Sequence, residues 1–440
     1  MATIYRNFYE KIFELAVAGS PKPAGGYYAL APGLILGHDP LIALLVDDFR
    51  ELRRKMPRGV NGKCFFTADH FAPPSTIERA GILKKFLDFS AEEKIRTVKV
   101  FEGICHQLLV ESPQARPFSF IIGSDSHTVT AGALASVAAG YGSMDILGAL
   151  ATGAVREKKY PVIGVRFTGK KKRFVTGRDI GLEIIARIGE GGAANRVLEY
   201  SDETAARIHI DDRFSVSNAS VECGAFTGLF RPDAVLLEYL AKRDNRSVKE
   251  LGRYFSDYAS DVGAGFDSSL GIDLSGLNPR VALPHDFSDI RDVSRLRRGV
   301  ALDQVFIGSC ASGRLLDFKY MCDTLDALGT RYRKTAVKKA PRVRLIVTPS
   351  SKNIYLRAMR AGYLEKLVNF GAVITNPSCG PCGGIDKGIL GENEVCLSTS
   401  TRNFRGRMGP FSSEIYIASP VTAILSAFTG KITPPEEVFK

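Results

Sequence analysis

The chain of 440 residues lacks several features that define large classes of protein. It has no apolar run of the roughly 20 residues that a membrane-spanning helix needs. Its first residues mix both charge signs with apolar positions at helical spacing, so they predict an amphipathic helix and not a secretory signal or a transit peptide. Its eight cysteines are too few for a disulfide framework at this length. We therefore expect a soluble, cytoplasmic protein in a reducing compartment.

Motifs for nucleotides and nucleic acids are also missing. The chain has no P-loop, and Gly189-Glu-Gly-Gly-Ala-Ala194 fits the loose dinucleotide pattern only after a predicted helix, where the pattern requires a strand. We therefore predict a plain loop there. The formal net charge of +12 raises nucleic acid as a partner, but the basic clusters are dispersed and match no nucleic-acid module. Solvated surfaces, an anionic substrate or an acidic partner subunit explain this charge better.

Length and periodicity predict an α/β protein of several domains. A chain of 440 residues exceeds what one hydrophobic core supports. Strands that alternate with helices indicate mostly parallel sheets covered on both faces. We predict domains over residues 1–160, 161–278 and 279–440. The predicted strands are residues 63–67, 97–101, 118–122, 162–167, 303–307, 342–347 and 372–375, and the predicted helices are residues 77–89, 131–151, 179–188 and 354–369.

Three cysteines in the last third of the chain follow two of these strands. Cys310 closes Phe306-Ile-Gly-Ser-Cys310, and Cys379 and Cys382 lie in Asn376-Pro-Ser-Cys-Gly-Pro-Cys382. Three thiolates on turns can hold an iron–sulfur cluster with one iron free of protein thiolate, which favours catalysis over electron transfer. From the cysteines alone, a redox dithiol and a zinc site remain open. The glycine-rich residues after Cys382 argue against a dithiol at a helix start, and no fourth Cys or His at short spacing supports zinc.

Polar residues also follow apolar runs in the first third of the chain. Asp69-His70, His106-Gln107 and Asp125-Ser126-His127 each stand at the end of such a run. Ligands of parallel sheets bind outside the carboxyl ends of the strands, so these segments and the cysteine turns could converge on one cleft. A carboxylate beside an imidazole fixes its tautomer and raises its pKa, as acid–base catalysis requires. His38-Asp39 adds another such pair, although a single pair is more often a turn or a surface pair.

Longer motifs in the chain resemble the aconitase superfamily, in the order in which that superfamily has them. The matching segments are Gly123-Ser-Asp-Ser-His-Thr128, Phe306-Ile-Gly-Ser-Cys310, Asn376-Pro-Ser-Cys-Gly-Pro-Cys382 and Ser400-Thr-Arg-Asn-Phe-Arg-Gly-Arg-Met408. Within the superfamily, Gly103-Ile-Cys-His-Gln107 and Ala418-Ser-Pro-Val-Thr-Ala423 are most similar to the large subunits of 3-isopropylmalate dehydratases. The resemblance covers nearly the whole chain.

This resemblance implies a fold and a cofactor. The implied fold has three α/β domains with mostly parallel sheets around a central iron–sulfur cleft, and it lacks the swivelling fourth domain. The first domain would carry the Asp–His pairs, and the third would carry the cysteines. A [4Fe–4S] cluster would be held by Cys310, Cys379 and Cys382, and its remaining iron would bind the substrate's hydroxyl and a carboxylate.

The resemblance also implies roles for individual residues. His70, paired with Asp69, would protonate the departing hydroxyl. The other residues with an implied catalytic role, which would hold the iron-bound water and orient the substrate, are His106, Asp125, His127 and Glu222. The residues implied to bind substrate are His38, Asp39, Ser126, Asn218, Arg402 and Arg407. Guanidinium groups suit the last two positions because they bind carboxylates with two parallel hydrogen bonds.

The implied activity is a hydro-lyase reaction on a small 2-hydroxy di- or tricarboxylic acid, most specifically the interconversion of 2- and 3-isopropylmalate in leucine biosynthesis. The missing fourth domain would supply a serine base and another arginine, so we expect the chain to need a small subunit, in a heterodimer or heterotetramer. Departures from the family pattern at Pro40, Ala311, Ser312 and Thr401 leave homoaconitase or another malate-type dehydratase as the alternative. A cluster-free RNA-binding protein and a thiol oxidoreductase are further alternatives.

Overall fold

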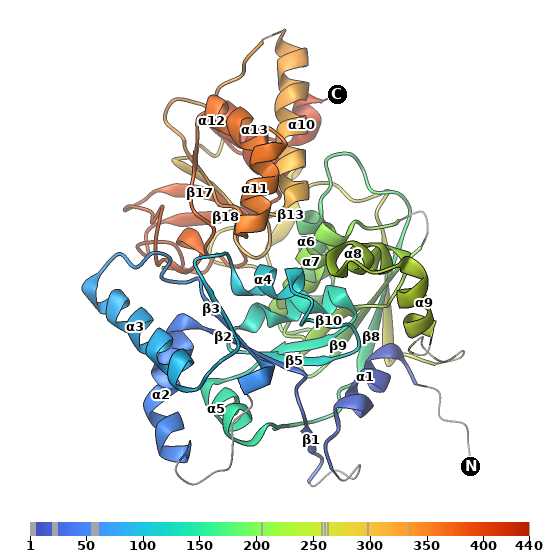
Figure 1. Cartoon of the computed structure of the whole chain (residues 1–440). Helices are drawn as coiled ribbons and strands as arrows, with labels where there is room; N and C mark the ends of the chain where they lie inside the picture. Colours follow the sequence, from blue (N-terminus) through green and yellow to red (C-terminus); the bar gives the residue numbers. More distant parts are fainter. Residues whose placement is uncertain are drawn as a thin grey trace. The chain divides into compact units, whose positions relative to one another are not determined.

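The computed structural model describes residues 6–19, 25–53, 61–203, 206–256, 258, 261, 264–296, 299–333 and 335–439. Within these ranges, no helix is both long and apolar enough to cross a bilayer. The chain divides into two compact units, whose elements are labelled in Figure 1. The first unit consists of Met1–Val100, Cys105–Gly169 and Gly191–Asp273, and the second consists of Phe101–Ile104, Lys170–Glu190 and Leu274–Lys440.

Five parallel strands form one sheet of the first unit, in the order β4-β3-β2-β5-β6. Every residue of β2, β3 and β5 is buried, as expected for parallel strands covered on both faces. Helices α2 and α3 pack against each other beside β2 and β3 (Figure 1). The bounds are β2 (Leu34–His38), α2 (Asp39–Arg53), β3 (Cys64–Ala68), α3 (Ile77–Glu92), β4 (Thr97–Val100), α4 (Cys105–Glu111), β5 (Phe120–Gly123), β6 (Val137–Gly140) and α5 (Ser143–Thr152).

A second parallel sheet of the first unit has four strands in the order β10-β9-β8-β11. The 3-10 helix η2 (Ser126–Leu134) packs against both β6 and β10, so it connects the five-stranded sheet to the four-stranded sheet. The remaining bounds are α1 (Phe8–Ala16), β1 (Tyr28–Leu30), η1 (Asn61–Lys63), β7 (Val155–Glu157), β8 (Val162–Thr168), β9 (Val197–Asp202), α7 (Ile210–Ala219), η3 (Ser220–Cys223), β10 (Thr227–Phe230), α8 (Ala234–Asp244), α9 (Val248–Ser256) and β11 (Ser268–Asp273).

The second unit contains a seven-stranded sheet in the order β13-β12-β18-β17-β14-β15-β16. Pairing is parallel from β18 to β16 and antiparallel at β12. Its core joins strand residues such as Val305 to helix residues such as Phe318 and Ile424. The bounds are α6 (Gly177–Ile188), β12 (Arg280–Ala282), β13 (Ile290–Asp292), η4 (Val293–Arg295), β14 (Gln304–Ile307), α10 (Leu315–Tyr332), β15 (Arg344–Val347), α11 (Lys352–Arg360), α12 (Tyr363–Phe370), β16 (Ala372–Ile374), η5 (Gly380–Gly383), β17 (Val395–Ser398), β18 (Glu414–Ala418), α13 (Pro420–Thr429) and α14 (Pro435–Val438).

The predicted α/β architecture with mostly parallel sheets is confirmed, and the segment after Gly189 is a loop as predicted. The amphipathic helix predicted at the start is α1, and residues 1–5 lie outside the described ranges. The helix predicted over residues 131–151 is wrong, because η2 ends at a left-handed Ala135 and β6 and α5 follow it. The helix predicted over residues 354–369 is two helices, separated at Gly362 with a φ of 74°.

The three larger sheets follow one another along the chain. Strands β2 to β6 lie within residues 34–140, strands β8 to β11 within residues 162–273, and strands β12 to β18 within residues 280–418. By compactness, however, the first two sheets belong to a single unit. The division into three domains at residues 160 and 278 therefore stays a prediction.

The contact between η2 and β10 gives a stability prediction. A Cβ added at Gly132 would overlap the carbonyl of Gly228, and the backbone on both sides is buried. We expect Gly132→Ala to lower the free energy of unfolding by about 1–3 kcal/mol, the usual range for overpacking. Gly148→Ala is the control, because nothing lies within 4 Å of a Cβ there and Gly148 is inside α5. Alanine at that position should stabilise by about 0.5–1 kcal/mol. Equal effects in urea denaturation would contradict the packing account.

Candidate active site

Predicted site residues gather at the carboxyl edge of the five-stranded sheet. β2 ends at His38, Asp69 and His70 follow β3, and Asp125 follows β5. Because β2 pairs in parallel with both β3 and β5, these strand ends lie at one edge of the sheet. His106, on α4 after β4, joins the group through a hydrogen bond to Asp125.

Glycine at position 37 allows α2 to begin directly after β2. The strand register pairs Gly37 with Phe66 of β3. A Cβ at residue 37 would lie only 2.7 Å from the Ile42 side chain and 2.8 Å from the Phe66 ring. The chain can therefore turn from β2 into α2 in close contact with β3, and this brings Asp39 next to the backbone of residues 69–71.

Asp69 and His70 form a hydrogen-bonded pair. His70 Nδ1 lies 3.0 Å from Asp69 Oδ1, and because an ionised carboxylate only accepts, Nδ1 carries the proton. The Thr67 hydroxyl donates to the same oxygen at 3.3 Å, and the Cys105 N–H donates to Oδ2 at 2.6 Å. Asp69 is fully buried, and these donors fix its carboxylate in place. This arrangement leaves His70 Nε2 as the atom that can exchange a proton with a ligand.

A second group links two histidines through carboxylates. His106 Nε2 lies 2.9 Å from Asp125 Oδ1, and the same oxygen accepts the His127 N–H at 2.8 Å. The His127 ring reaches on to Glu222, with 2.8 Å between Nε2 and Oε1. Both rings are buried, so each histidine is held in one orientation by a carboxylate. The structure thus brings together four of the residues predicted to be catalytic.

The other predicted residues of this unit lie around these two groups. The Ser126 hydroxyl is 3.4 Å from His127 Nδ1. Asn218 is fully buried on α7 and donates from Nδ2 to the Thr130 hydroxyl at 2.9 Å. The His38 ring stacks on the His70 ring with 4.2 Å between centroids. The substrate-binding roles of His38, Ser126 and Asn218 stay predictions.

Burial and charge give the groups of this site distinct protonation states. Burial opposes a proton on His70, but the carboxylates of Asp69 and Asp39 outweigh burial and raise its pKa to about 9. Burial and the nearby charge of His70 lower the pKa of His38 to about 4. Burial would raise the pKa of Asp125, but His106 and His127 hold it well below its ordinary value. At neutral pH, the stacked pair therefore carries one positive charge, which is on the His70 ring.

The same balance acts on His127. Burial lowers its pKa, but the hydrogen bonds with Asp125 and Glu222 outweigh burial and raise it above its ordinary value. The two carboxylates therefore favour the charged form of the His127 ring. The site as a whole combines a protonated His70 with nearby carboxylates, an arrangement suited to giving a proton to a departing oxygen.

In the second unit, the three predicted cysteines stand on two turns at the carboxyl ends of parallel strands. Cys310 follows β14, and Cys379 and Cys382 flank the start of η5 after β16. Both turns lie against Thr348, which follows β15. A Cβ at Gly308 would be 2.8 Å from the Thr348 carbonyl oxygen, and a Cβ at Gly380 would be 3.5 Å from its hydroxyl. Small residues beside the cysteines thus allow both turns to approach one point.

The donor set of these turns fits an iron–sulfur cluster. None of the eight cysteines, all of which lie in the described ranges, forms a disulfide, and Cys310 and Cys382 are buried. No described group of three ligand atoms within 4.8 Å consists of these three sulfurs, although tetrahedral zinc brings thiolates to about 3.8 Å from one another. Cys379 precedes a four-residue 3-10 turn, not the α-helix start that activates a redox dithiol, as predicted from the glycines.

Two predicted arginines belong to the same unit. The Arg407 Nη2 atom is 3.9 Å from Cys382 Sγ, and the guanidinium lies over the Phe404 ring at 5.4 Å. Arg402 is partly exposed between two buried residues. Thr401, one of the departures from the family pattern, has its hydroxyl 3.8 Å from Cys382 Sγ. The other departures in this unit, Ala311 and Ser312, are both fully buried next to Cys310.

The sequence motifs missed residues that act only through contacts distant along the chain. Thr67 and Cys105 donate to Asp69, and Thr348 lies between the cysteine turns. Arg314, fully buried, donates to the Cys310 carbonyl at 2.6 Å and so holds that turn. Cys105 lies in the quoted segment Gly103-Ile-Cys-His-Gln107, but nothing in that segment shows that its backbone N–H holds Asp69.

Comparison with known proteins shows which family and which relatives the chain is similar to. The model of the aconitase family (aconitate hydratase) matches residues 11–298 and 292–430. A probable 3-isopropylmalate dehydratase large subunit of Methanosarcina mazei is 36% identical over 432 residues, which cover 98% of this chain and 99% of that protein. The 3-isopropylmalate dehydratase large subunit of Wolinella succinogenes is 37% identical over 434 residues, with the same coverage of 98% and 99%.

A relative with a different substrate in its name is also similar. The 2,3-dimethylmalate dehydratase large subunit of Eubacterium barkeri is 39% identical over 380 residues, which cover 86% of each chain. Identity alone therefore does not separate the two substrates, whereas all three relatives are named as large subunits of dehydratases.

The stacked histidines give a prediction for NMR titration of the isolated chain. We expect His70 to hold its proton to about pH 9 and His38 to stay neutral down to about pH 4. Because the pKa of His70 in the folded chain exceeds the unfolded value of about 6.5, its protonation stabilises the fold fully below pH 6.5, and this contribution is lost as pH rises through 9. Asp69→Asn should move the His70 pKa toward 6.5 and flatten that pH dependence.

Asp47→Asn is the control for this titration. Asp47 is an exposed carboxylate of the same unit that pairs with Lys85 at 2.6 Å. The account is wrong if His70 titrates near its ordinary pKa in the unchanged chain, or if Asp47→Asn shifts it as far as Asp69→Asn does. With six histidines in the chain, single His→Gln variants are enough to assign the signals.

Proposed function

The chain belongs to the aconitase family, and we propose that it is the large, cluster-binding subunit of a hydro-lyase that dehydrates and rehydrates a small 2-hydroxy di- or tricarboxylic acid. The specific activity is that of 3-isopropylmalate dehydratase, which interconverts 2- and 3-isopropylmalate in leucine biosynthesis. The observation that carries this conclusion is similarity over 98% of the chain to large subunits with that name. The paired carboxylates and imidazoles at the sheet edge suit the chemistry.

The cofactor in this proposal is a [4Fe–4S] cluster, which members of the aconitase family typically bind. Cys310, Cys379 and Cys382 would hold it, supported by the lack of a disulfide at any of them and by the approach of both turns to Thr348. When bound, the cluster supplies a Lewis acid at the iron without a protein thiolate, and this iron polarises the substrate hydroxyl. Two other buried cysteines of the same unit, Cys322 and Cys396, lie outside this set.

The residues of the first unit would move and hold protons in this reaction. His70 donates the proton from Nε2 to the departing hydroxyl, and Asp69 compensates the imidazolium charge before that transfer. His106 and His127, each fixed by Asp125, hold the departing water and keep it oriented for the reverse addition. Glu222 fixes the outer side of His127.

Substrate carboxylates would be bound by arginines of the second unit. Arg402 and Arg407 suit this role because a guanidinium forms paired hydrogen bonds to a carboxylate. The position of Arg407 near Cys382 Sγ supports it. His38, Ser126 and Asn218 are the residues of the first unit that would bind substrate.

The partner in this proposal is a small subunit that carries the swivelling domain. The relatives are named large subunits, which implies a small one. The small subunit would bring a serine base and a further arginine, in a heterodimer or heterotetramer. A small dicarboxylate is the substrate, whereas nucleic acid and membranes are not partners in this proposal.

A malate-type dehydratase with another substrate is the second candidate. The similarity to the large subunit of 2,3-dimethylmalate dehydratase supports it. So do the departures from the family pattern: Pro40 in the first turn of α2, Ala311 and Ser312 beside Cys310, and Thr401 beside Cys382. All of these positions neighbour residues of the proposed site, where a change of side chain alters which substrate fits.

Cluster binding is tested by anaerobic reconstitution of the chain with iron and sulfide. We expect broad iron–sulfur absorption with about four irons per chain. Cys310→Ala removes one of the three proposed thiolate ligands. Because only two remain, this variant should lose most of the absorption. Cys322→Ala is the matched control, because Cys322 is also a buried thiol of the second unit but lies on α10. Equal absorption in both variants would contradict the assignment of the ligands.

The need for a partner is tested by assaying the reconstituted chain with and without a small subunit. We expect turnover of 3-isopropylmalate only in the presence of the small subunit, because the base is missing otherwise. Turnover by the chain alone would overturn the proposal of a shared site. 2,3-Dimethylmalate and homoaconitate are assayed in parallel with 3-isopropylmalate. The ratios of the three kcat/KM values identify the preferred substrate.

A further inference from the structure

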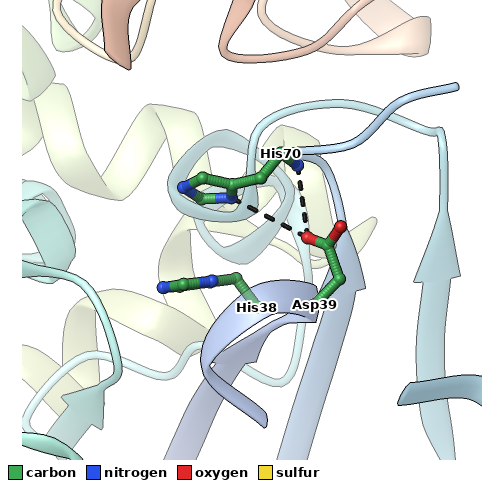
Figure 2. A group of neighbouring side chains, drawn as sticks. All are labelled: His38, Asp39 and His70. Atoms are coloured by element: carbon green, nitrogen blue, oxygen red, sulfur yellow. Dashed lines mark hydrogen bonds and ion pairs between the residues drawn. The ribbon is translucent and has the colours of Figure 1, made fainter. Parts of the chain in front are cut away.

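Asp39, one of the predicted substrate-binding residues, has a carboxylate whose polar contacts, among the described residues, are only with the protein backbone and the His70 ring. It is the first residue of α2, and its side chain is fully buried. Oδ1 accepts the N–H groups of Asp69 and His70, each at 3.2 Å, and Oδ2 accepts the N–H of Phe71 at 3.2 Å. Figure 2 shows the carboxylate beneath the backbone of His70, with Oδ1 also 3.8 Å from the ring Nδ1. Three consecutive backbone donors thus converge on one carboxylate.

This contact fixes a segment that regular structure does not hold. Residues 69–71 follow the end of β3, so their N–H groups have no partner in the sheet. A buried N–H without a partner is costly, and a buried carboxylate needs several donors to stay ionised. Burial and the charge of Asp69 raise the pKa of Asp39, whereas the charge of His70 and the N–H groups of His70 and Phe71 oppose that rise. The carboxylate of Asp39 therefore accepts the hydrogen bonds that the three N–H groups need. These hydrogen bonds fix the position of the backbone that carries the His70 side chain.

The neighbouring residue, His38, packs against a face of the same imidazole. The His38 ring lies against the His70 ring at an angle of 26° (Figure 2). The His38 N–H is held by the Ser124 hydroxyl at 3.1 Å, which fixes the end of β2. His38 Nδ1 is buried and has no hydrogen-bond partner among the described residues, in contrast to the oxygens of Asp39, which both accept backbone N–H groups.

We infer that Asp39 is a positioning residue of the reaction, which sets the place of the His70 ring through the backbone of residues 69–71 and does not touch the substrate. This inference rests on the proposed function, because it takes His70 as the proton donor. It separates two adjacent residues that the sequence treats alike: His38 packs against the ring of His70, and Asp39 holds the backbone that carries it. Proton transfer is sensitive to such placement, since a shift of about 1 Å can cost on the order of 100-fold in rate.

Asp39→Asn tests the inference. An amide has one acceptor oxygen, and its NH2 group would face a backbone N–H, so at least one of the three hydrogen bonds is lost. In the reconstituted complex with the small subunit, we expect kcat to fall roughly 10- to 100-fold with KM within about twofold of the original value. In the isolated chain without cluster, the NMR signals of the His70 ring should shift. Asp39→Glu keeps both acceptor oxygens and should recover part of kcat.

Asp179→Asn is the matched control. Asp179 is also a fully buried carboxylate near a helix start, and it accepts the N–H groups of Thr176 at 2.8 Å and Arg280 at 2.9 Å. Both Asn variants should lower the urea midpoint, but Asp179→Asn should leave kcat and the His70 signals unchanged. If Asp39→Asn fails to fold, Asp39→Glu supplies the same comparison with a smaller change.

Two results would overturn the inference. A rise of KM at unchanged kcat would show that Asp39 binds substrate. Loss of stability with unchanged kcat and unchanged His70 signals would reduce Asp39 to a structural role. Failure of the proposed function has a different signature, because the unchanged complex would then lack hydro-lyase activity while the NMR comparison of the isolated chain still reports on Asp39 and His70.

Discussion

Parallel strand pairing is the constraint on which the candidate site depends. In each unit it delivers chemically active side chains to one edge of a sheet: His38, His70 and Asp125 in the first, and Cys310 and Cys379 in the second. Such strands lie between covering layers, so their ends must turn within dense packing. Glycines at 37 and 308 make these turns possible, since a Cβ at either would overlap a neighbouring residue, Ile42 or Thr348, and Gly380 is needed for its left-handed φ of 58°. The pairing of the strands and the turns that follow them therefore determine where the site residues lie.

Much of the buried polarity serves to hold the reactive groups in place. Asp69 meets His70 with one oxygen and the Cys105 backbone with the other, and Asp125 ties two histidines together. Asp69 is buried and Asp125 partly buried, so donors fixed in the fold offset the loss of water around their charges, and this arrangement is ready before a substrate arrives. In the second unit, Arg314 acts similarly on the Cys310 carbonyl. The same networks that satisfy buried charges thus preorganise the chemistry.

The sequence predicted most strands, because buried parallel strands are apolar runs that end abruptly in polar residues. It predicted the acid–base pairs for the same reason, since Asp69 and His70 are adjacent in the chain. It failed at residues 131–151, where alanine-rich sequence favours a helix but burial between two sheets selects a 3-10 segment and a strand instead. It could not separate His38 from Asp39, because their difference depends on backbone groups about 30 residues away. Contacts of that kind leave no local signal.

The central proposal is that three cysteines leave one iron of the cluster open to substrate. The proton donor would belong to this chain, and the base to a partner subunit. Mössbauer spectroscopy of the chain reconstituted with iron-57 tests the first part most directly, because it resolves individual iron environments. The account predicts that adding 3-isopropylmalate to the complex with the small subunit changes one of four iron environments and leaves the other three as they were. Four equivalent irons that do not respond to any of the candidate substrates would contradict it.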